Sequence, residues 1–105
     1  MQLCEEVESV SYFIVARWVA IPENQAEIEE ILRELVPQCR AEPGCISFVA
    51  HQSAERANEF LLYEHYREED DFANHQLTPH FKELVLRRAV PLLASRERLP
   101  YRVLV

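Results

Sequence analysis

Apolar residues follow two different periods along this chain, and the change of period separates the elements that we predict. Residues 11–20, SYFIVARWVA, are mainly β-branched, aromatic or apolar, which predicts a strand. Both faces of this strand are largely apolar, so we expect both to be covered. After Pro22, Glu23 and Asn24 the apolar residues recur at steps of three and four, which predicts an amphipathic helix. We expect Pro37 to bend or loosen its last turn. The helix should bury Ile28, Ile31, Leu32, Leu35, Val36 and Cys39.

The middle of the chain predicts a turn followed by a hairpin. Gly44, the only glycine, lies between two patterned segments and indicates the turn that ends the helix. Residues 45–52 and 59–66 predict the second and third strands, and the polar residues 53–58 predict the turn that joins them. Residues 67–71 then predict a charged turn.

The last third of the chain predicts two helices and a final strand. A short helix runs through Phe72 and His75, and Thr78-Pro79 is typical of a cap followed by proline at the first helical position. The next helix should end near Pro91, and residues 101–105 predict the final strand. This helix should bury Phe81, Leu84, Val85 and Ala89.

The predicted order is therefore β-α-β-β-α-α-β. This order indicates an α+β fold, the ferredoxin-like arrangement, with an antiparallel sheet and helices on one face. The other sheet face carries enough apolar residues to leave a large patch in water. Burying that face against a second copy gives a two-fold homodimer, the commonest soluble assembly.

Composition narrows the classes of function. The 105 residues fit one domain, which we place at 11–105, with residues 1–10 as a flexible N-terminal segment that lacks the basic start and apolar centre of a signal peptide. A net charge of −7, from 18 acidic and 11 basic side chains, disfavours nucleic acid as a partner. The basic clusters at 87–88 and 96–98 are too short to change this. No apolar run approaches the ~20 residues that span a membrane.

The cysteines indicate a reducing compartment. Cys4, Cys39 and Cys45 are an odd set without CxxC spacing, which argues against a disulfide framework and against a zinc site. We therefore expect a cytoplasmic protein without a metal. The acidic runs 27–34 and 68–71 are interpreted as solvated faces.

Five short pieces of the chain together carry a resemblance to a known family. They are residues 41–45 (AEPGC), His51, residues 62–64 (LYE), His75 and residues 79–81 (PHF). In this order and spacing, the region from residue 12 to 105 resembles the antibiotic biosynthesis monooxygenase family of the dimeric α/β-barrel superfamily. The resemblance implies a homodimer whose two sheets form a barrel, with a pocket between sheet and helices in each subunit.

The resemblance implies several possible activities. Relatives include cofactor-free oxygenases of aromatic polyketides and quinol-type substrates, heme-degrading enzymes and an isomerase of a phosphorylated sugar, so membership does not settle function. The chain also departs from these relatives. The polyketide oxygenase is similar to this chain around the third strand. It has Asn, Trp and Tyr in its pocket, at the positions of Leu62, Tyr66 and Phe72 here. Val85 and Ala16 stand where the heme enzymes have a ligand His and an Asn, so heme is not expected.

Cofactor-free oxygenation needs a base, hydrogen bonds to the substrate anion and a dry pocket. Three histidines are candidate bases, since their pKa lies near neutrality: His51, His75 and His80. Each also has a structural interpretation, as a rim, helix or capping contact. Glu64, in an apolar strand, must be paired or neutral. It either acts as a base, orients a histidine or pairs with Arg17, and the pairing with Arg17 is favoured slightly.

Aromatic and apolar side chains are candidates for the wall of a substrate pocket, although such residues are more often plain core. By strand alternation Leu62, Glu64 and Tyr66 share one face, while Tyr63 and His65 share the other, so His65 is interpreted as structural. The candidate substrate-binding residues are Trp18, Leu62, Tyr66, Phe72, Phe81 and Val85.

Three functions are compatible with these residues. The first is a cofactor-independent monooxygenase that acts on quinol-like or other small aromatic substrates with molecular oxygen. The second is a non-catalytic dimeric ligand-binding or stress-response module. The third is an isomerase of a small phosphorylated metabolite, whose pocket would need cations from Arg17, Lys82, Arg87 or Arg88.

Overall fold

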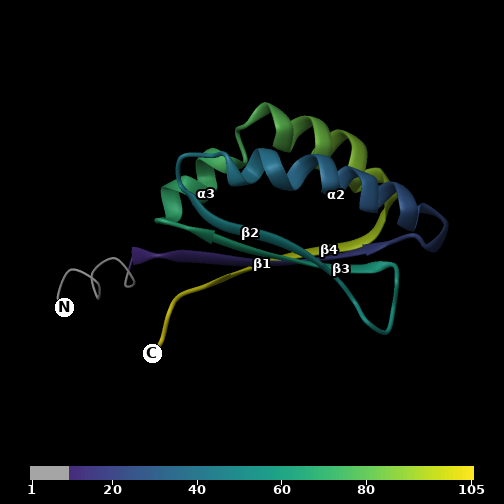
Figure 1. The fold of residues 1–105 in the computed structure, drawn as a ribbon, viewed down its shortest axis with the longest axis horizontal. Helices are drawn as coiled ribbons and strands as arrows, with labels where there is room; N and C mark the ends of the chain where they lie inside the picture. The colour runs from purple at the N-terminus through teal and green to yellow at the C-terminus, as the bar shows by residue number, and fades with distance from the viewer. Residues whose placement is uncertain (1–9) are drawn as a thin grey trace.

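The computed structural model describes residues 10–105, and its central feature is a four-stranded antiparallel sheet with the strand order β2-β3-β1-β4 (Figure 1). The strands are β1 (Tyr12–Ala20), β2 (Cys45–Gln52), β3 (Glu59–Tyr66) and β4 (Leu93–Tyr101). The predicted bounds of the first three strands are confirmed to within one residue. Residues 1–9 lie outside the described part, so the flexible segment predicted for 1–10 stays a prediction.

The helices all cover one face of the sheet (Figure 1). A short turn, η1 (Pro22–Asn24), leads into α2 (Gln25–Arg40), and α3 (Glu69–His75) follows β3. The chain then forms η2 (Phe81–Ala89) and η3 (Val90–Leu92) before β4. This arrangement confirms the predicted ferredoxin-like α+β fold.

Helix α2 packs on the sheet with the face that its period predicts. All six residues expected to be buried are buried, and Cys39 and Ile28 have no exposed surface. The helix continues through Pro37 to Arg40.

Helix η2 buries its predicted residues but winds more widely than an α-helix. The backbone N–H of Val90 donates to the carbonyl of Val85, five residues earlier, as in a π-helix. Thr78 caps its start, as expected, because its Oγ1 accepts a hydrogen bond from the backbone N–H of Phe81 at 3.2 Å.

Two sequence predictions about element bounds were wrong. The final strand is Leu93–Tyr101 and not residues 101–105. Pro100 is tolerated there because β4 is an edge strand that pairs only with β1. Residues 69–71 belong to α3 and not to a charged turn, because three carboxylates in the first turn favour a helix N-terminus.

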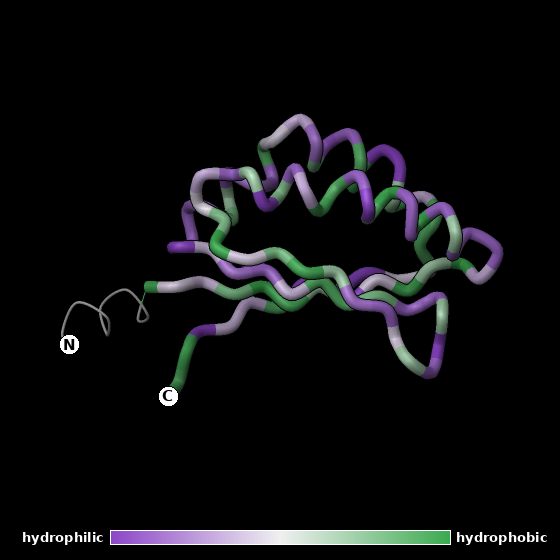
Figure 2. Tube along the Cα trace, in the orientation of Figure 1, coloured by the Kyte–Doolittle hydropathy of each residue, from purple (hydrophilic) through white to green (hydrophobic). Residues whose placement is uncertain are grey.

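The second face of the sheet is open and carries large apolar side chains beside charged ones such as Arg17 and Glu59. Figure 2 shows hydrophobic residues along the strands as well as on the helix sides that face them. Phe13, Leu61 and Tyr63 project from this face, since strand register pairs Phe13 with His65, Val15 with Tyr63 and Arg17 with Leu61. Leu61 and Tyr63 are each 39% exposed. In the described part of the chain no helix is long and apolar enough to cross a membrane.

Candidate functional site

A small cavity lies between the inner face of the sheet and the helices. Its volume is about 10 Å³, which is room for about one water molecule. The wall is mostly apolar, but four charged or titratable side chains reach it. It is lined by Ala16, Trp18, Leu35, Phe48, Leu62, Glu64, Phe72, His75, Phe81, Val85, Arg96 and Arg98.

Glu64 is a buried carboxyl group in the wall of this cavity. Strand register places it beside Ile14 and Phe48 on the inner face, and it is 4% exposed. The hydroxyl of Tyr66 donates a hydrogen bond to its Oε1 at 2.6 Å. Burial raises the pKa of Glu64 to about 7, although the Tyr66 hydrogen bond and nearby His75 oppose that rise. Both protonation states are therefore populated near neutral pH.

Two arginines on β4 bring positive charge to the same cavity. Arg96 pairs with Trp18 and Arg98 with Ala16 in strand register, which directs both toward the inner face. The buried Nε of Arg96 has no hydrogen-bond partner among the described residues. Its guanidinium carbon lies 5.9 Å from the ring centroid of Phe81, and burial lowers the pKa of Arg96. An unpaired buried donor of this kind favours an anionic ligand.

His75 lines the inner cavity and also contacts Glu42, which in turn contacts His80. It ends α3, is 3% exposed and packs edge-on against the Phe81 ring at a centroid distance of 5.1 Å. Its Nδ1 lies 2.8 Å from Oε2 of Glu42, and Nε2 of His80 lies 2.6 Å from the same oxygen. Burial opposes ionisation of Glu42, but the hydrogen bonds from both histidines outweigh it and lower the pKa of Glu42.

The turn that carries Glu42 is packed closely against α3. A Cβ atom on Gly44 would lie 2.0 Å from Cγ of Asp71, so only glycine fits at this position. Asp71 in turn forms an ion pair with Arg67 at 3.0 Å. The glycine therefore sets the approach between the Glu42 turn and the helix that carries His75.

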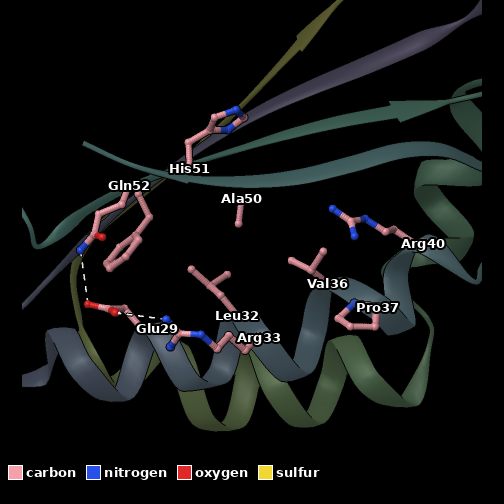
Figure 3. Close-up of a pocket in the computed structure, with 10 residues that line it drawn as sticks. Glu29, Leu32, Arg33, Val36, Pro37, Arg40, Ala50, His51 and Gln52 are labelled. Carbon is pink, nitrogen blue, oxygen red and sulfur yellow. Dashed lines mark hydrogen bonds and ion pairs between the residues drawn. The ribbon is translucent and has the colours of Figure 1, made fainter. Parts of the chain in front are cut away.

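His51 lies apart from the other three candidate catalytic residues. It pairs with Leu61 on the outer side of the sheet, and its Nδ1 lies 3.2 Å from the Leu61 carbonyl oxygen. Figure 3 shows it on the side of β2 away from α2, whereas Ala50 points toward the helix.

The groove between α2 and β2 in Figure 3 is larger than the inner cavity, at about 380 Å³. Its charged groups already have partners, and its two arginines are exposed. Arg33 pairs with Glu29 and Glu30, and Arg40 donates to the Phe48 carbonyl oxygen at 2.9 Å. The inner cavity, with the raised pKa of Glu64 and the unpaired Nε of Arg96, is the stronger candidate site.

Most of the predicted pocket residues meet at this cavity. Trp18, Leu62, Phe72, Phe81 and Val85 all line it, and the sixth residue, Tyr66, is buried beside it and bonds to Glu64. Their roles in binding substrate stay a prediction.

The predicted ion pair between Glu64 and Arg17 was wrong. Arg17 projects from the outer face, where it pairs with Glu59 at 3.1 Å and Glu97 at 3.7 Å, while Glu64 faces inward. The isomerase alternative needs cations in the pocket. None of the four candidate cations lines the inner cavity: Arg17, Lys82, Arg87 and Arg88.

Sequence reasoning missed Arg96, Arg98 and Glu42. The alternation of Arg96, Glu97 and Arg98 is the period of a strand, and it could have placed both arginines on one face. Glu42 carries no such signal, because it lies in a turn and meets His75 and His80 only through the tertiary fold.

Comparison with known proteins adds a family. The family model described as "Antibiotic biosynthesis monooxygenase" matches residues 11–86. The protein named "Putative monooxygenase Rv0793" from Mycobacterium tuberculosis is 29% identical over 68 residues, which is 65% of this chain and 66% of that protein, just under two thirds of its length.

Solved structures share nearly the whole fold. The crystal structure of PA3566 from Pseudomonas aeruginosa has a TM-score of 0.87 and 28% identity, covering 93% of this chain and 98% of its own. A structure named "Putative antibiotic biosynthesis monooxygenase from Nitrosomonas europaea" has a TM-score of 0.81 and 26% identity, covering 91% and 92%.

Proposed function

This chain belongs to the antibiotic biosynthesis monooxygenase family, and we propose that it is a cofactor-independent monooxygenase of quinol-like or other small aromatic substrates. The observation that carries the proposal is Glu64, a buried carboxyl group with a pKa of about 7 in a cavity that also holds two arginines. A base of this pKa can take a phenolic proton at neutral pH.

The proposed reaction uses the substrate as the only reductant. Glu64 accepts the proton of a phenolic hydroxyl, and the electron-rich phenolate then reacts with molecular oxygen. For a phenol with a hydrogen on the ring carbon para to its hydroxyl, one oxygen atom is inserted to give a quinone. The second oxygen atom leaves as water, so the substrate supplies all four electrons.

The other cavity residues support this chemistry because they supply positive charge and exclude water. Arg96 and Arg98 stabilise the phenolate, and the unpaired Nε of Arg96 supplies a hydrogen-bond donor to it. Trp18, Leu62 and the Phe81 ring exclude water from the reacting centre.

Substrate access requires the cavity to widen, because about 10 Å³ holds no aromatic ring. The lining residues nearest solvent are Arg98, which is exposed, and Phe72 and Arg96, which are half-buried. Movement of these three side chains opens the cavity while the strands stay in place. His75 remains at the inner wall, and His80 supports it through Glu42.

Oxygen uptake tests the proposal directly. A panel of phenols and quinols that includes 1-naphthol and a reduced naphthoquinone is supplied without added flavin, metal or heme. We expect substrate-dependent uptake by the unaltered protein and a loss of about a hundredfold or more in Glu64→Gln. No uptake above the spontaneous rate across the panel contradicts the proposed activity. Tight binding of a panel member without turnover supports the ligand-binding module instead.

We also propose that the active form is a homodimer paired through the outer sheet face. The exposed Leu61, Tyr63 and Leu99 on that face support it, since a patch of this kind is costly in water. A cytoplasmic location is part of the proposal, supported by the free thiols of Cys39 and Cys45.

A further inference from the structure

Four side chains with metal-binding atoms converge beside the inner cavity: Cys39, Glu42, His75 and His80. One ligand atom from each lies within 4.8 Å of the corresponding atoms of the other three. We propose that these four residues bind a structural Zn²⁺ ion, with one sulfur, two nitrogens and one carboxylate oxygen as its ligands. This donor set suits zinc, which is bound by cysteine, histidine and acidic side chains in tetrahedral sites.

The ligands come as two pairs from neighbouring segments. Cys39 in the last turn of α2 and Glu42 in the following turn are three residues apart, and His75 and His80 are five apart. Structural zinc sites commonly combine a pair of this first spacing with a histidine pair of the second. Here a glutamate stands where such sites have their second cysteine. A search of the sequence for the CxxC spacing therefore does not find this site.

The hydrogen bonds between Glu42 and the two histidines already hold these three ligand atoms near the spacing that a zinc ion requires. Oε2 of Glu42 lies 2.8 Å from Nδ1 of His75 and 2.6 Å from Nε2 of His80. Ligand atoms on one tetrahedral Zn²⁺ ion are roughly 3.3 Å apart, given zinc–ligand bonds of about 2.0–2.1 Å. Binding of the ion therefore requires these contacts to lengthen by less than about 1 Å, which side-chain rotation supplies.

Charge balance favours a divalent cation at this depth. Cys39 is fully buried, and the side chains of Glu42 and His75 are 10% and 3% exposed. A thiolate and a carboxylate together neutralise Zn²⁺, so the loaded site carries no net charge into the interior. Without an ion, burial and the nearby Glu42 carboxylate raise the pKa of the Cys39 thiol, so zinc has to displace its proton.

An ion can reach the site from solvent. A pocket of about 240 Å³ opens beside Glu42 and His75, and Thr78, Asn74 and Asp71 form part of its wall. Two of the four proposed ligands, Glu42 and His75, therefore line a pocket that is open to solvent. Zinc can therefore enter without unfolding of the helices.

The proposed site has a structural role, because all four ligands come from the protein and none of the coordination positions is left for substrate. The ion would tie the end of α2 to α3 and to the start of η2. It would also fix the ring of His75, which forms part of the cavity wall. Zinc has no redox chemistry of its own, so the zinc site and the oxygenase proposal stand or fall separately.

The test measures metal binding by the whole protein in a Cys4→Ser background, which removes a thiol outside the described residues. Metal-free protein is titrated with Zn²⁺ against a chromophoric chelator, and with Co²⁺ as a spectroscopic probe. The site variants are Cys39→Ser and His80→Ala. The matched controls are Cys45→Ser, a half-buried thiol outside the cluster, and His51→Ala, an exposed histidine on the outer face.

We expect one equivalent of Zn²⁺ in the background protein and in both controls, with affinity at least about tenfold weaker in both site variants. Co²⁺ should give tetrahedral visible bands and a thiolate charge-transfer band, and the charge-transfer band should be lost in Cys39→Ser. At the same zinc concentration, the melting temperature should rise more in the background protein than in His80→Ala.

Two outcomes overturn the proposal. One is binding of less than one equivalent by the background protein. The other is binding that both site variants retain but His51→Ala or Cys45→Ser loses, which would identify an adventitious surface ion. Circular dichroism of each variant shows that it is folded. If His80→Ala is unfolded, Glu42→Gln, which keeps the side-chain size, replaces it in the comparison.

Discussion

Tyr66 donates its hydroxyl hydrogen to Oε1 of Glu64 across 2.6 Å, and the two residues are two positions apart on β3. Strand alternation therefore places both on the inner face, where each is at most 4% exposed. The hydrogen bond favours the charged carboxylate, while burial favours the neutral acid. Burial is the larger effect, so the pKa of Glu64 stays above its ordinary value.

Glu64→Gln should change how stability depends on pH. The folded-state pKa of about 7 exceeds the ordinary value of 4.5, so the folded protein binds more protons than the unfolded chain between these values. Stability from this group is full below about pH 4.5 and falls as pH rises through 7, by about 3 kcal/mol. Glutamine accepts the Tyr66 hydrogen bond but cannot ionise. Its free energy of unfolding, measured in urea, should therefore exceed that of the unaltered protein at pH 8.5 but not at pH 4.5.

The matched control for this measurement is Glu97→Gln, on the outer face of β4, where the carboxyl group is exposed. Its effect on unfolding should be small and should vary little between the two pH values. A constant difference between Glu64→Gln and the unaltered protein across the range would show that Glu64 titrates normally.

Arg96→Met should weaken substrate binding without loss of stability. Methionine fills much of the same volume, and the substitution removes a half-buried cation whose Nε is unpaired, so the free energy of unfolding should stay level or rise by about 1 kcal/mol. Loss of a charged hydrogen bond to the phenolate costs about 1.5–3 kcal/mol, which is roughly a ten- to hundredfold fall in kcat/KM. Arg33→Met, at an exposed position of α2 away from the cavity, is the control and should leave kcat/KM unchanged. Equal losses of kcat/KM in both variants would show that Arg96 has no specific role in binding the phenolate.

Gly44→Ala should destabilise the protein, because the new methyl group would overlap Asp71. Overpacking of this kind costs about 1–3 kcal/mol, measured as a lower urea midpoint with an unchanged slope. Asp71→Gly in the same chain should recover part of the loss, since it removes the atoms that the methyl group meets. An additive double variant would show that the contact is not the cause.

An aspartate on the outer face should separate the proposed dimer. Tyr63→Asp places a charge between Val15 and Val49 on the outer face, and analytical ultracentrifugation at micromolar concentration should then detect monomer. Leu86→Asp is the control, because Leu86 is 47% exposed on the helical side. If the unaltered protein already sediments as a monomer, the proposed pairing through this face is wrong.

The fold could be predicted from the sequence wherever one period ran for a whole element. The buried face of α2 was predicted in full, and β2 and β3 begin and end where the alternation does. Strand β4 was missed because it is exposed along most of its length and has no buried residue to mark its alternation. Its Arg-Glu-Arg run and Pro100 are typical of a loop when no partner strand is known.

The candidate site could be predicted only in part, for the same reason. Alternation placed Leu62, Glu64 and Tyr66 on one face. The arginines that face Glu64 depend on the pairing of β4 with β1, which no local pattern predicts. Glu42 meets two histidines more than thirty residues away, and such a contact arises because the turn after α2 packs against α3 and the start of η2, not from a periodic signal.

Arg96 and Arg98 lie on an edge strand, and this position affects how substrate specificity can change among homologues. Strand β4 has one neighbour, so its side chains can be exchanged while the remaining three strands keep their register. The acid and the aromatic wall, by contrast, are built into central strands and covered helices, where substitution disturbs the core. Evolution can thus retune the polarity of the entrance independently of the proton acceptor, and homologues with different substrates are expected to differ first along this border.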